Sequence, residues 1–193
     1  QLANGLTYRD FIIAGLLIKK AIPDASAKDG TLQDNWIYLQ DGSIKAGRLQ
    51  IFNNWSPHMV HDPSTMWIGV EYFCNAGDPF WNKSDEAIAR TAMEELEKIG
   101  FINKEDVLDH TVVKVEKAYP SYTGTYNRFD EIKNYLNKFS NLYNIGRNGM
   151  HRYNNTDHSM MTAIQTVKHI INNIPDREAI WNINMEQEYH EEK

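Results

Sequence analysis

The chain has 193 residues, 41% of them hydrophobic, which is enough for one domain with a sizeable core or at most two small ones. Its formal net charge of −6 disfavours a generic nucleic-acid surface, because phosphate binding usually needs an excess of Lys and Arg on one face. The single cysteine, Cys74, excludes an intrachain disulfide and favours a reducing cytoplasm, and no apolar run approaches the roughly 20 residues that span a bilayer.

The first half of the chain is predicted to consist mainly of strands. Residues 11–19 form a continuous apolar run, typical of a strand that is covered on both faces. Residues 35–40, 46–53 and 66–74 are rich in aromatic or β-branched residues, which also favour strands. Two prolines predict a loop over 54–63, since each removes an amide donor and fixes φ.

The second half is predicted to alternate helices with strands. Apolar residues at helical spacing predict helices over 84–99, 125–139 and 157–173. Residues 111–119 alternate enough for a strand that ends before a proline, and residues 141–145 form a short strand. Strands first and helices later predict an α+β fold, with a mixed β-sheet and packed helices.

Residues 1–173 are expected to form one domain, which ends in a strand-turn-helix unit over 141–173. The acidic residues near the C-terminus predict a solvated tail over 174–193. The chain begins without a methionine, and we expect it to be a piece of a longer protein.

Several side chains in and near the predicted strands are assigned structural roles. Three tryptophans are expected in the core: Trp36, Trp67 and Trp81. Trp55 either lines a substrate pocket or, as we favour, anchors its loop onto the core. Arg48 either faces an active-site cavity or, slightly favoured, pairs with Glu71 on a neighbouring strand.

Histidines near acidic residues suggest metal binding at two places, 58–62 and 151–158. The first place is a proline-flanked loop without helical spacing, and the second has no further ligands nearby. Zinc sites favour recognisable Cys and His spacing, and the chain has one cysteine. No metal site is therefore predicted.

The polar segment from Gly146 to Ser159 is the strongest candidate for a ligand site. It lies between an apolar strand and an apolar helix, so that backbone amides and the positive helix end can face a bound anion or cofactor. Gly146 allows close approach of the backbone, and Arg147 can fork onto a phosphate pair. The structural alternative, a polar turn that caps the helix through Asn155, Thr156 or Asp157, is about equally consistent with these residues.

Residues 145–157, Ile-Gly-Arg-Asn-Gly-Met-His-Arg-Tyr-Asn-Asn-Thr-Asp, resemble the C-terminal signature of UDP-galactopyranose mutases. More widely, they resemble the second flavin motif of the amine oxidase and protoporphyrinogen oxidase superfamily. The resemblance continues upstream in four segments: 35–38, 47–57, 69–73 and 117–120. The superfamily binds the ADP half of FAD with a Gly-x-Gly-x-x-Gly turn, which this sequence lacks. The resemblance therefore implies the C-terminal, substrate-side part of a two-domain FAD-dependent fold, whose partner is a missing N-terminal FAD-binding region.

The resemblance also implies roles for individual residues. Arg147 matches the mutase arginine that binds the diphosphate of the nucleotide sugar, and Tyr153 matches the tyrosine beside it. Gly146 falls where the chain passes close to the flavin. The following residues fall at the start of the helix that faces the flavin: Asn155, Thr156, Asp157, His158 and Ser159. Asn155 departs from the pattern, because mutases have an acidic residue there.

The function implied is that of a flavin-dependent mutase or oxidoreductase acting on a nucleotide sugar or a related polar substrate, in the synthesis of cell-surface polysaccharides. The flavin, and no protein side chain, is the reacting group. The alternatives are an amine or protoporphyrinogen oxidase-like oxidoreductase and a non-catalytic module that binds nucleotide sugars or carbohydrates. We expect the isolated chain to be inactive and to bind FAD weakly or not at all.

Overall fold

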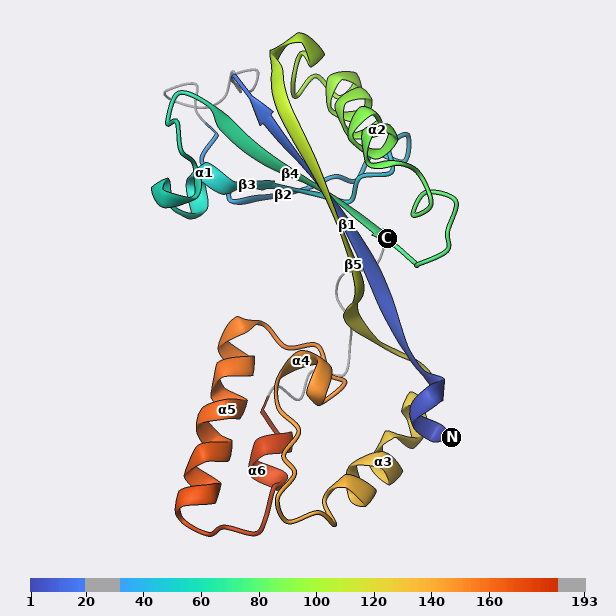
Figure 1. The fold of residues 1–193 in the computed structure, drawn as a ribbon, viewed down its shortest axis with the longest axis vertical. Coiled ribbons are helices and arrows are strands. Elements are labelled where there is room, and N and C mark those ends of the chain that lie inside the picture. Colours follow the sequence, from blue (N-terminus) through green and yellow to red (C-terminus); the bar gives the residue numbers. More distant parts are fainter. Residues whose placement is uncertain (20–31, 184–193) are drawn as a thin grey trace. The chain divides into compact units, whose positions relative to one another are not determined.

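The chain folds into two compact units in the computed structural model, which describes residues 1–19 and 32–183 (Figure 1). The helical unit comprises Gln1–Arg9 and the described chain from Lys117 onward. The sheet unit comprises the described part of Asp10–Glu116. The sequence led us to expect one domain over most of the chain, and this division was not anticipated.

A five-stranded sheet has the order β2-β3-β4-β1-β5 (Figure 1). Its strands have these bounds: β1 Leu6–Ile18, β2 Trp36–Tyr38, β3 Arg48–Ile51, β4 Met66–Cys74 and β5 Val107–Gly124. The pairs β1–β4, β2–β3 and β3–β4 are antiparallel, and Gly15 lies opposite Gly69 in the first of them. The predicted α+β fold, and the strands predicted in the first half, are confirmed.

The strand β5 is longer than predicted, and Pro120 lies within it. We expected the strand to end before this proline. β5 is the outermost strand in the sheet order, and an edge strand tolerates proline because one side of it needs no amide donors.

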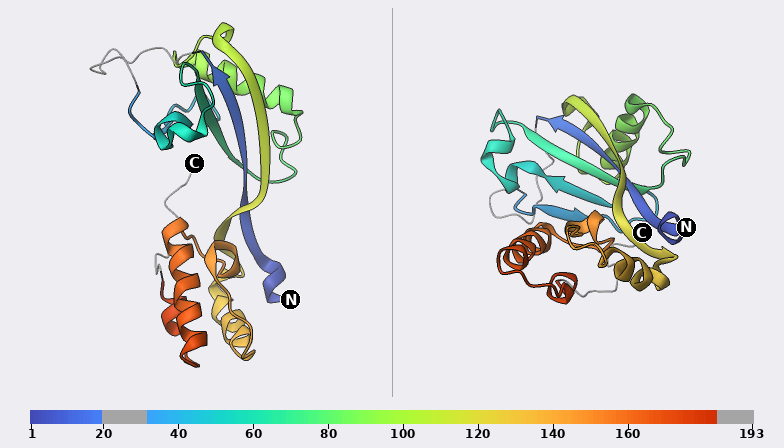
Figure 2. Two further views of the ribbon diagram at one scale, coloured as in Figure 1. Left: turned by 60° about the vertical axis from the view of Figure 1, so that its left-hand side comes forward. Right: turned by 60° about the horizontal axis from the view of Figure 1, so that its bottom comes forward.

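The helix α2 (Asp85–Lys98) packs on one face of the sheet (Figure 1, Figure 2). It begins at Ser84, whose side chain accepts a hydrogen bond from the amide of Ala87, and acidic residues in its first turn suit the helix dipole. The chain turns away at Gly100, whose φ of +73° favours glycine. The core consists of alternate residues of the strands and one face of α2: Ile12, Ala14, Leu16, Ile68, Val70, Ile88, Ala92 and Leu96.

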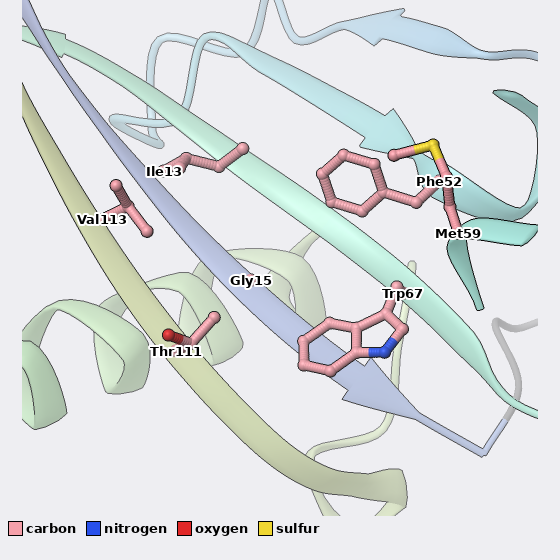
Figure 3. Close-up of a pocket in the computed structure, with 7 residues that line it drawn as sticks. All are labelled: Ile13, Gly15, Phe52, Met59, Trp67, Thr111 and Val113. Carbon is pink, nitrogen blue, oxygen red and sulfur yellow. The ribbon is translucent and has the colours of Figure 1, made fainter. Parts of the chain in front are cut away.

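The other face of the sheet carries a shallow apolar hollow with a volume of about 340 Å³ (Figure 3). Its wall includes the short helices that follow β3: α1 (Phe52–Trp55) and η2 (Pro57–Met59). A β-carbon on Gly69 would lie 3.1 Å from the ring of Phe52, and one on Gly15 would lie 3.4 Å from the ring of Trp67. The two glycines thus let both rings lie against the sheet backbone.

The helical unit contains the remaining helices and a small core. Its helices are η1 Leu2–Gly5, η4 Tyr126–Arg128, α3 Phe129–Leu136, α4 Gly146–Gly149, α5 Thr156–Ile171 and α6 Glu178–Trp181, and the sheet unit also contains η3 Lys104–Asp106. The core is centred on Phe129, Met150 and Trp181. No helix among the described residues has the length and apolar composition needed to cross a membrane.

The strand predicted over 141–145 is wrong: these residues have no regular secondary structure. Arg177 accounts for part of the difference, because its guanidinium binds the carbonyl of Leu142, which a strand would use. It donates to the carbonyl oxygens of Leu142, Phe139 and Ser140 at 2.5 to 3.0 Å. It also lies 4.2 Å from the ring centroid of Tyr143.

The tail predicted over 174–193 begins with ordered structure. α6 buries Ile180 and Trp181, and the indole N–H of Trp181 donates to Asn137 at 3.2 Å. The acidic residues that follow these apolar side chains dominate the composition of the segment, so composition alone predicts a solvated tail. Residues 184–193 lie outside the described part of the chain.

The helix predicted over 157–173 is present as α5, but its apolar side is exposed. The buried positions are Thr162, Thr166 and His169. The apolar residues that stand in line on α5 are largely exposed: Met160 59%, Ile164 45%, Val167 52% and Ile171 71%. Thr162 explains part of this orientation, because its hydroxyl accepts from the amide of Gly146 at 3.0 Å and so turns the polar side toward α4.

Candidate functional site

The candidate site begins at Gly146, where the chain enters α4. Gly146 has a φ of +71°, which favours glycine. A β-carbon there would lie 3.9 Å from the side chain of Ser159, an ordinary contact, so the backbone conformation and not crowding requires glycine. The hydrogen bond from Gly146 to Thr162 ties the turn to α5.

Arg147 lies between backbone carbonyls and two aromatic rings. Its Nε donates to the carbonyl oxygen of Asn154 at 2.9 Å, and its Nη1 donates to that of Ala118 at 3.4 Å. Its guanidinium carbon lies 4.7 Å from the ring centroid of Tyr119 and 5.0 Å from that of Tyr153. Among the described residues, no carboxylate pairs with Arg147, so its charge is not compensated by this part of the chain.

Two other arginines of the helical unit also bind carbonyl oxygens, and the comparison distinguishes Arg147 from them. Arg177 is 9% exposed and its hydrogen bonds use both of its terminal nitrogens. Arg152 donates to the carbonyl oxygen of Trp181. Arg147 is half-buried, and its bonds through Nε and Nη1 leave N–H groups of the planar fork for a ligand.

The start of α5 is capped and also has two backbone amides without an acceptor in the described chain. Asn155 and His158 form a capping box: the Asn155 side chain accepts from the His158 amide, and the Asn155 amide donates to Nδ1 of His158 at 3.3 Å. Within the described chain, the amides of Thr156 and Asp157 have no acceptor. The capped turn, which was the structural alternative, is therefore present, and it leaves these two donors at the positive helix end.

Buried polar atoms without partners lie beside this turn. Asn154 is 1% exposed, and its Oδ1 accepts no hydrogen bond from any described residue. His151 is 2% exposed with a φ of +45°, its Nε2 is 3.2 Å from the Ser121 carbonyl oxygen, and its Nδ1 has no partner in the described chain. Burial lowers the pKa of His151 below its usual value. An orphaned buried acceptor such as Asn154 Oδ1 is an atom that a ligand can satisfy.

The structure brings together the residues that the sequence predicted and adds others. Tyr119, Asn154 and the buried His151 were not predicted as site residues. Tyr119 lies in β5, far from Arg147 in the sequence, and only the resemblance over 117–120 indicated it. Asn154 stood in the polar run, but its burial could not be inferred from residue type.

The structure also describes Arg48, the apolar hollow of the sheet unit and the candidate metal ligands. Arg48 pairs with Glu71 through a 2.5 Å contact between Nε and Oε2, which confirms the favoured alternative. The hollow in Figure 3 is lined by apolar side chains and Thr111, and no titratable group lines it. In the described part of the chain, no three His, Cys, Asp or Glu side chains gather as a metal site.

Comparisons with known proteins define the class of the fold. No protein-family model matches the chain, and no curated protein matches it. Solved structures do match, and the chain shares their fold. At the identities found, these matches establish the fold alone.

One match is the crystal structure of reduced UDP-galactopyranose mutase, with a TM-score of 0.76 and 19% identity over 95% of this chain and 37% of that one. A protein from Exiguobacterium sp. 255-15 named as a protoporphyrinogen oxidase matches with a TM-score of 0.55 and 14% identity, over 86% of this chain and 36% of that one. The resemblance inferred from residues 145–157 is thus confirmed at the level of fold. The chain spans little more than a third of the length of either protein.

Proposed function

We propose that this chain is the substrate-side part of an FAD-dependent enzyme in which Arg147 and Tyr153 bind the anionic part of a nucleotide sugar. The observation that carries the proposal is the guanidinium of Arg147, fixed by carbonyls and tyrosine rings yet without a carboxylate partner in the described chain. A half-buried unpaired charge is costly, and a diphosphate would offset that cost through charge-assisted hydrogen bonds. A planar guanidinium against aromatic rings suits a bidentate anion better than an ammonium group would.

The start of α5 is proposed to hold the flavin end of FAD. The open amides of Thr156 and Asp157 suit a ring carbonyl, and the orphaned Oδ1 of Asn154 suits an N–H or O–H donor. Gly146 and Ser159 flank this turn. Asn155 and His158 bond to each other, so their proposed part is to fix the turn that the flavin meets. When bound, FAD supplies the redox or nucleophilic chemistry, and these residues hold and orient it.

The exposed side of α5 supports the proposed partner, an N-terminal FAD-binding region. A soluble chain rarely leaves a contiguous row of Met, Ile and Val residues in water, and Met160, Ile164, Val167 and Ile171 form such a row. The mutase that this chain resembles is far longer than the chain. We therefore infer that the FAD-binding region covers this side of α5 in the full-length protein.

Mutase chemistry is favoured over amine oxidation by the unpaired Arg147, because an amine substrate brings no anion for it to bind. The proposal includes a cytoplasmic enzyme of polysaccharide synthesis. The test is to incubate the full-length, reduced protein with UDP-galactopyranose and to follow the furanose product by chromatography. Furanose formation supports mutase chemistry, and its absence from a protein that binds FAD contradicts it.

A further inference from the structure

Three aromatic side chains meet at the edge of the sheet unit and are exposed there. Trp36 and Tyr38 stand on one face of the edge strand β2, since residues two apart share a face, and Trp55 ends α1. Their exposed fractions are 45%, 56% and 41%. The ring centroids of Trp36 and Trp55 are 4.8 Å apart with planes at 73°, and we call these three residues the aromatic corner. The core position expected for Trp36 is therefore wrong.

A buried polar cluster contacts the rings of the aromatic corner. Arg48 is 4% exposed, and its guanidinium carbon lies 4.9 Å from the ring centroid of Trp36 and 5.6 Å from that of Tyr38. Its Nη1 donates to the Tyr38 hydroxyl at 3.4 Å. Glu71, which is fully buried, pairs with Arg48 and also accepts from Gln50. The rings are thus positioned before any ligand arrives, which lowers the entropic cost of binding.

The helix α1 is held to the same edge. The side-chain amide of Asn54 donates to the carbonyl oxygens of Leu32 and Asp34, both at 2.9 Å. These bonds connect the residue before Trp55 to the segment that leads into Trp36. The orientation of the two indoles is therefore set by backbone contacts as well as by ring packing.

The charge balance of the aromatic corner defines the chemistry of its ligand. The charge of Arg48 is compensated by Glu71, so the corner presents ring faces and polar ring edges without a spare positive charge. A phosphate or carboxylate ligand would need such a charge. The indole N–H groups of Trp36 and Trp55 have no acceptor within the described residues, so they can donate to a neutral ligand.

We propose that the aromatic corner binds the ring of a neutral sugar. The C–H groups of a hexose ring form an apolar face that stacks on an indole, and its hydroxyls accept from the indole N–H groups. Three side chains are far fewer than the roughly 20–30 residues a side that a stable protein interface uses. The proposal goes beyond the function proposed above, because it concerns the sheet unit and requires neither flavin nor Arg147.

The test titrates the ¹⁵N-labelled protein with galactose, lactose and cellobiose and follows the indole N–H signals by NMR. Saturable shifts of the Trp36 and Trp55 signals, with the Trp81 signal unmoved, are expected. Trp36→Ala should weaken sugar binding roughly tenfold, and Trp81→Phe is the matched control that should leave it unchanged. Should Trp36→Ala fail to fold, Tyr38→Leu at the same edge takes its place.

No saturable shift with any of the three sugars would overturn the proposal. A Trp55 signal that shifts with wild-type sugar affinity in Trp36→Ala would also overturn it, as would shifts of the Trp36 signal with UDP but not with the sugars. A titration of Arg147→Ala separates this proposal from the one above, because sugar binding at the aromatic corner should survive that change.

Discussion

Arg147 donates a hydrogen bond from Nε to the backbone carbonyl oxygen of Asn154, at 2.9 Å, and so closes the polar segment that precedes α5. The bond places an uncompensated cation beside the buried side chain of Asn154, whose Oδ1 accepts no hydrogen bond within the described chain. A cation and an orphaned acceptor at the start of a helix are groups that a ligand could pair, and the proposed substrate site rests on them.

Glycine is required to different degrees at two positions of the helical unit. Gly146→Ala should destabilise by about 1–2 kcal/mol, because φ of +71° is strained for alanine while Ser159 leaves room for a methyl group. Gly124→Ala should cost more, because φ is +65° and the new β-carbon would fall on the carbonyl oxygen of Gly5. Urea unfolding of the two variants compares them directly, and equal losses would contradict the steric explanation.

Removal of Glu71 should strongly destabilise the sheet unit, because Arg48 would remain buried without its counterion. Glu71→Ala is expected to lower the free energy of unfolding by about 3–5 kcal/mol. The double variant Arg48→Met with Glu71→Leu should recover most of this loss, since buried pairs are often replaceable by apolar residues. Chemical denaturation of the single and double variants measures both. A single variant within about 1 kcal/mol of the wild type would show that the pair is not needed.

The exposed side of α5 should affect assembly without affecting the stability of the chain. Ile164→Lys with Val167→Lys changes two exposed residues, so the melting temperature of this chain should change little. In the full-length protein the same changes should abolish FAD retention, because they charge the surface proposed to contact the FAD-binding region. Flavin absorbance after gel filtration is the measurement, and full retention of FAD would argue against that contact.

A matched control exists on the opposite side of α5. Thr162→Val removes the acceptor of the Gly146 amide, so it should destabilise the chain by about 1–3 kcal/mol, the cost of an unpaired buried donor. The loss of stability should therefore appear in Thr162→Val and not in Ile164→Lys with Val167→Lys, which separates the two sides of the helix.

Acid should weaken the helical unit through His151. Its pKa is lowered in the folded chain by burial, so the unfolded chain binds more protons once the pH falls below about 6.5. Stability from this group is therefore full above that pH and declines as the pH falls toward the folded pKa. Urea midpoints at two pH values either side of 6.5 should show the decline in the wild type and a smaller one in His151→Asn, which tolerates the φ of +45°. Identical pH dependence in both proteins would exclude His151 as the cause.

The sequence predicted the strands of the first half well, because a buried strand such as residues 66–74 has an apolar and aromatic composition that few other elements share. It predicted α5 but not which side is buried, since helical periodicity identifies an apolar side without identifying what covers it. Residues 141–145 have an extended-looking composition, and the distant Arg177, which binds the carbonyl of Leu142, contributes to their irregular backbone.

The candidate site was predicted in part. Gly146, Arg147 and the helix start were located from residue types in one segment. Tyr119 of β5 contacts Arg147, which lies far from it in the sequence, and residue types do not reveal this contact. They do not reveal the burial of Asn154 either. The exposed Trp36 was missed because tryptophan is usually buried, and its exposure follows from the edge position of β2.

The most direct test of the proposed function is calorimetric titration of the full-length protein with UDP, comparing the wild type with Arg147→Lys and Arg147→Ala. Arg147→Ala should weaken binding by about 1.5–3 kcal/mol, the range for hydrogen bonds to charged groups. Arg147→Lys should recover only part of the loss, because an ammonium group lacks the planar fork. Equal UDP affinities of the wild type and Arg147→Ala would contradict the assignment of Arg147 to an anionic substrate.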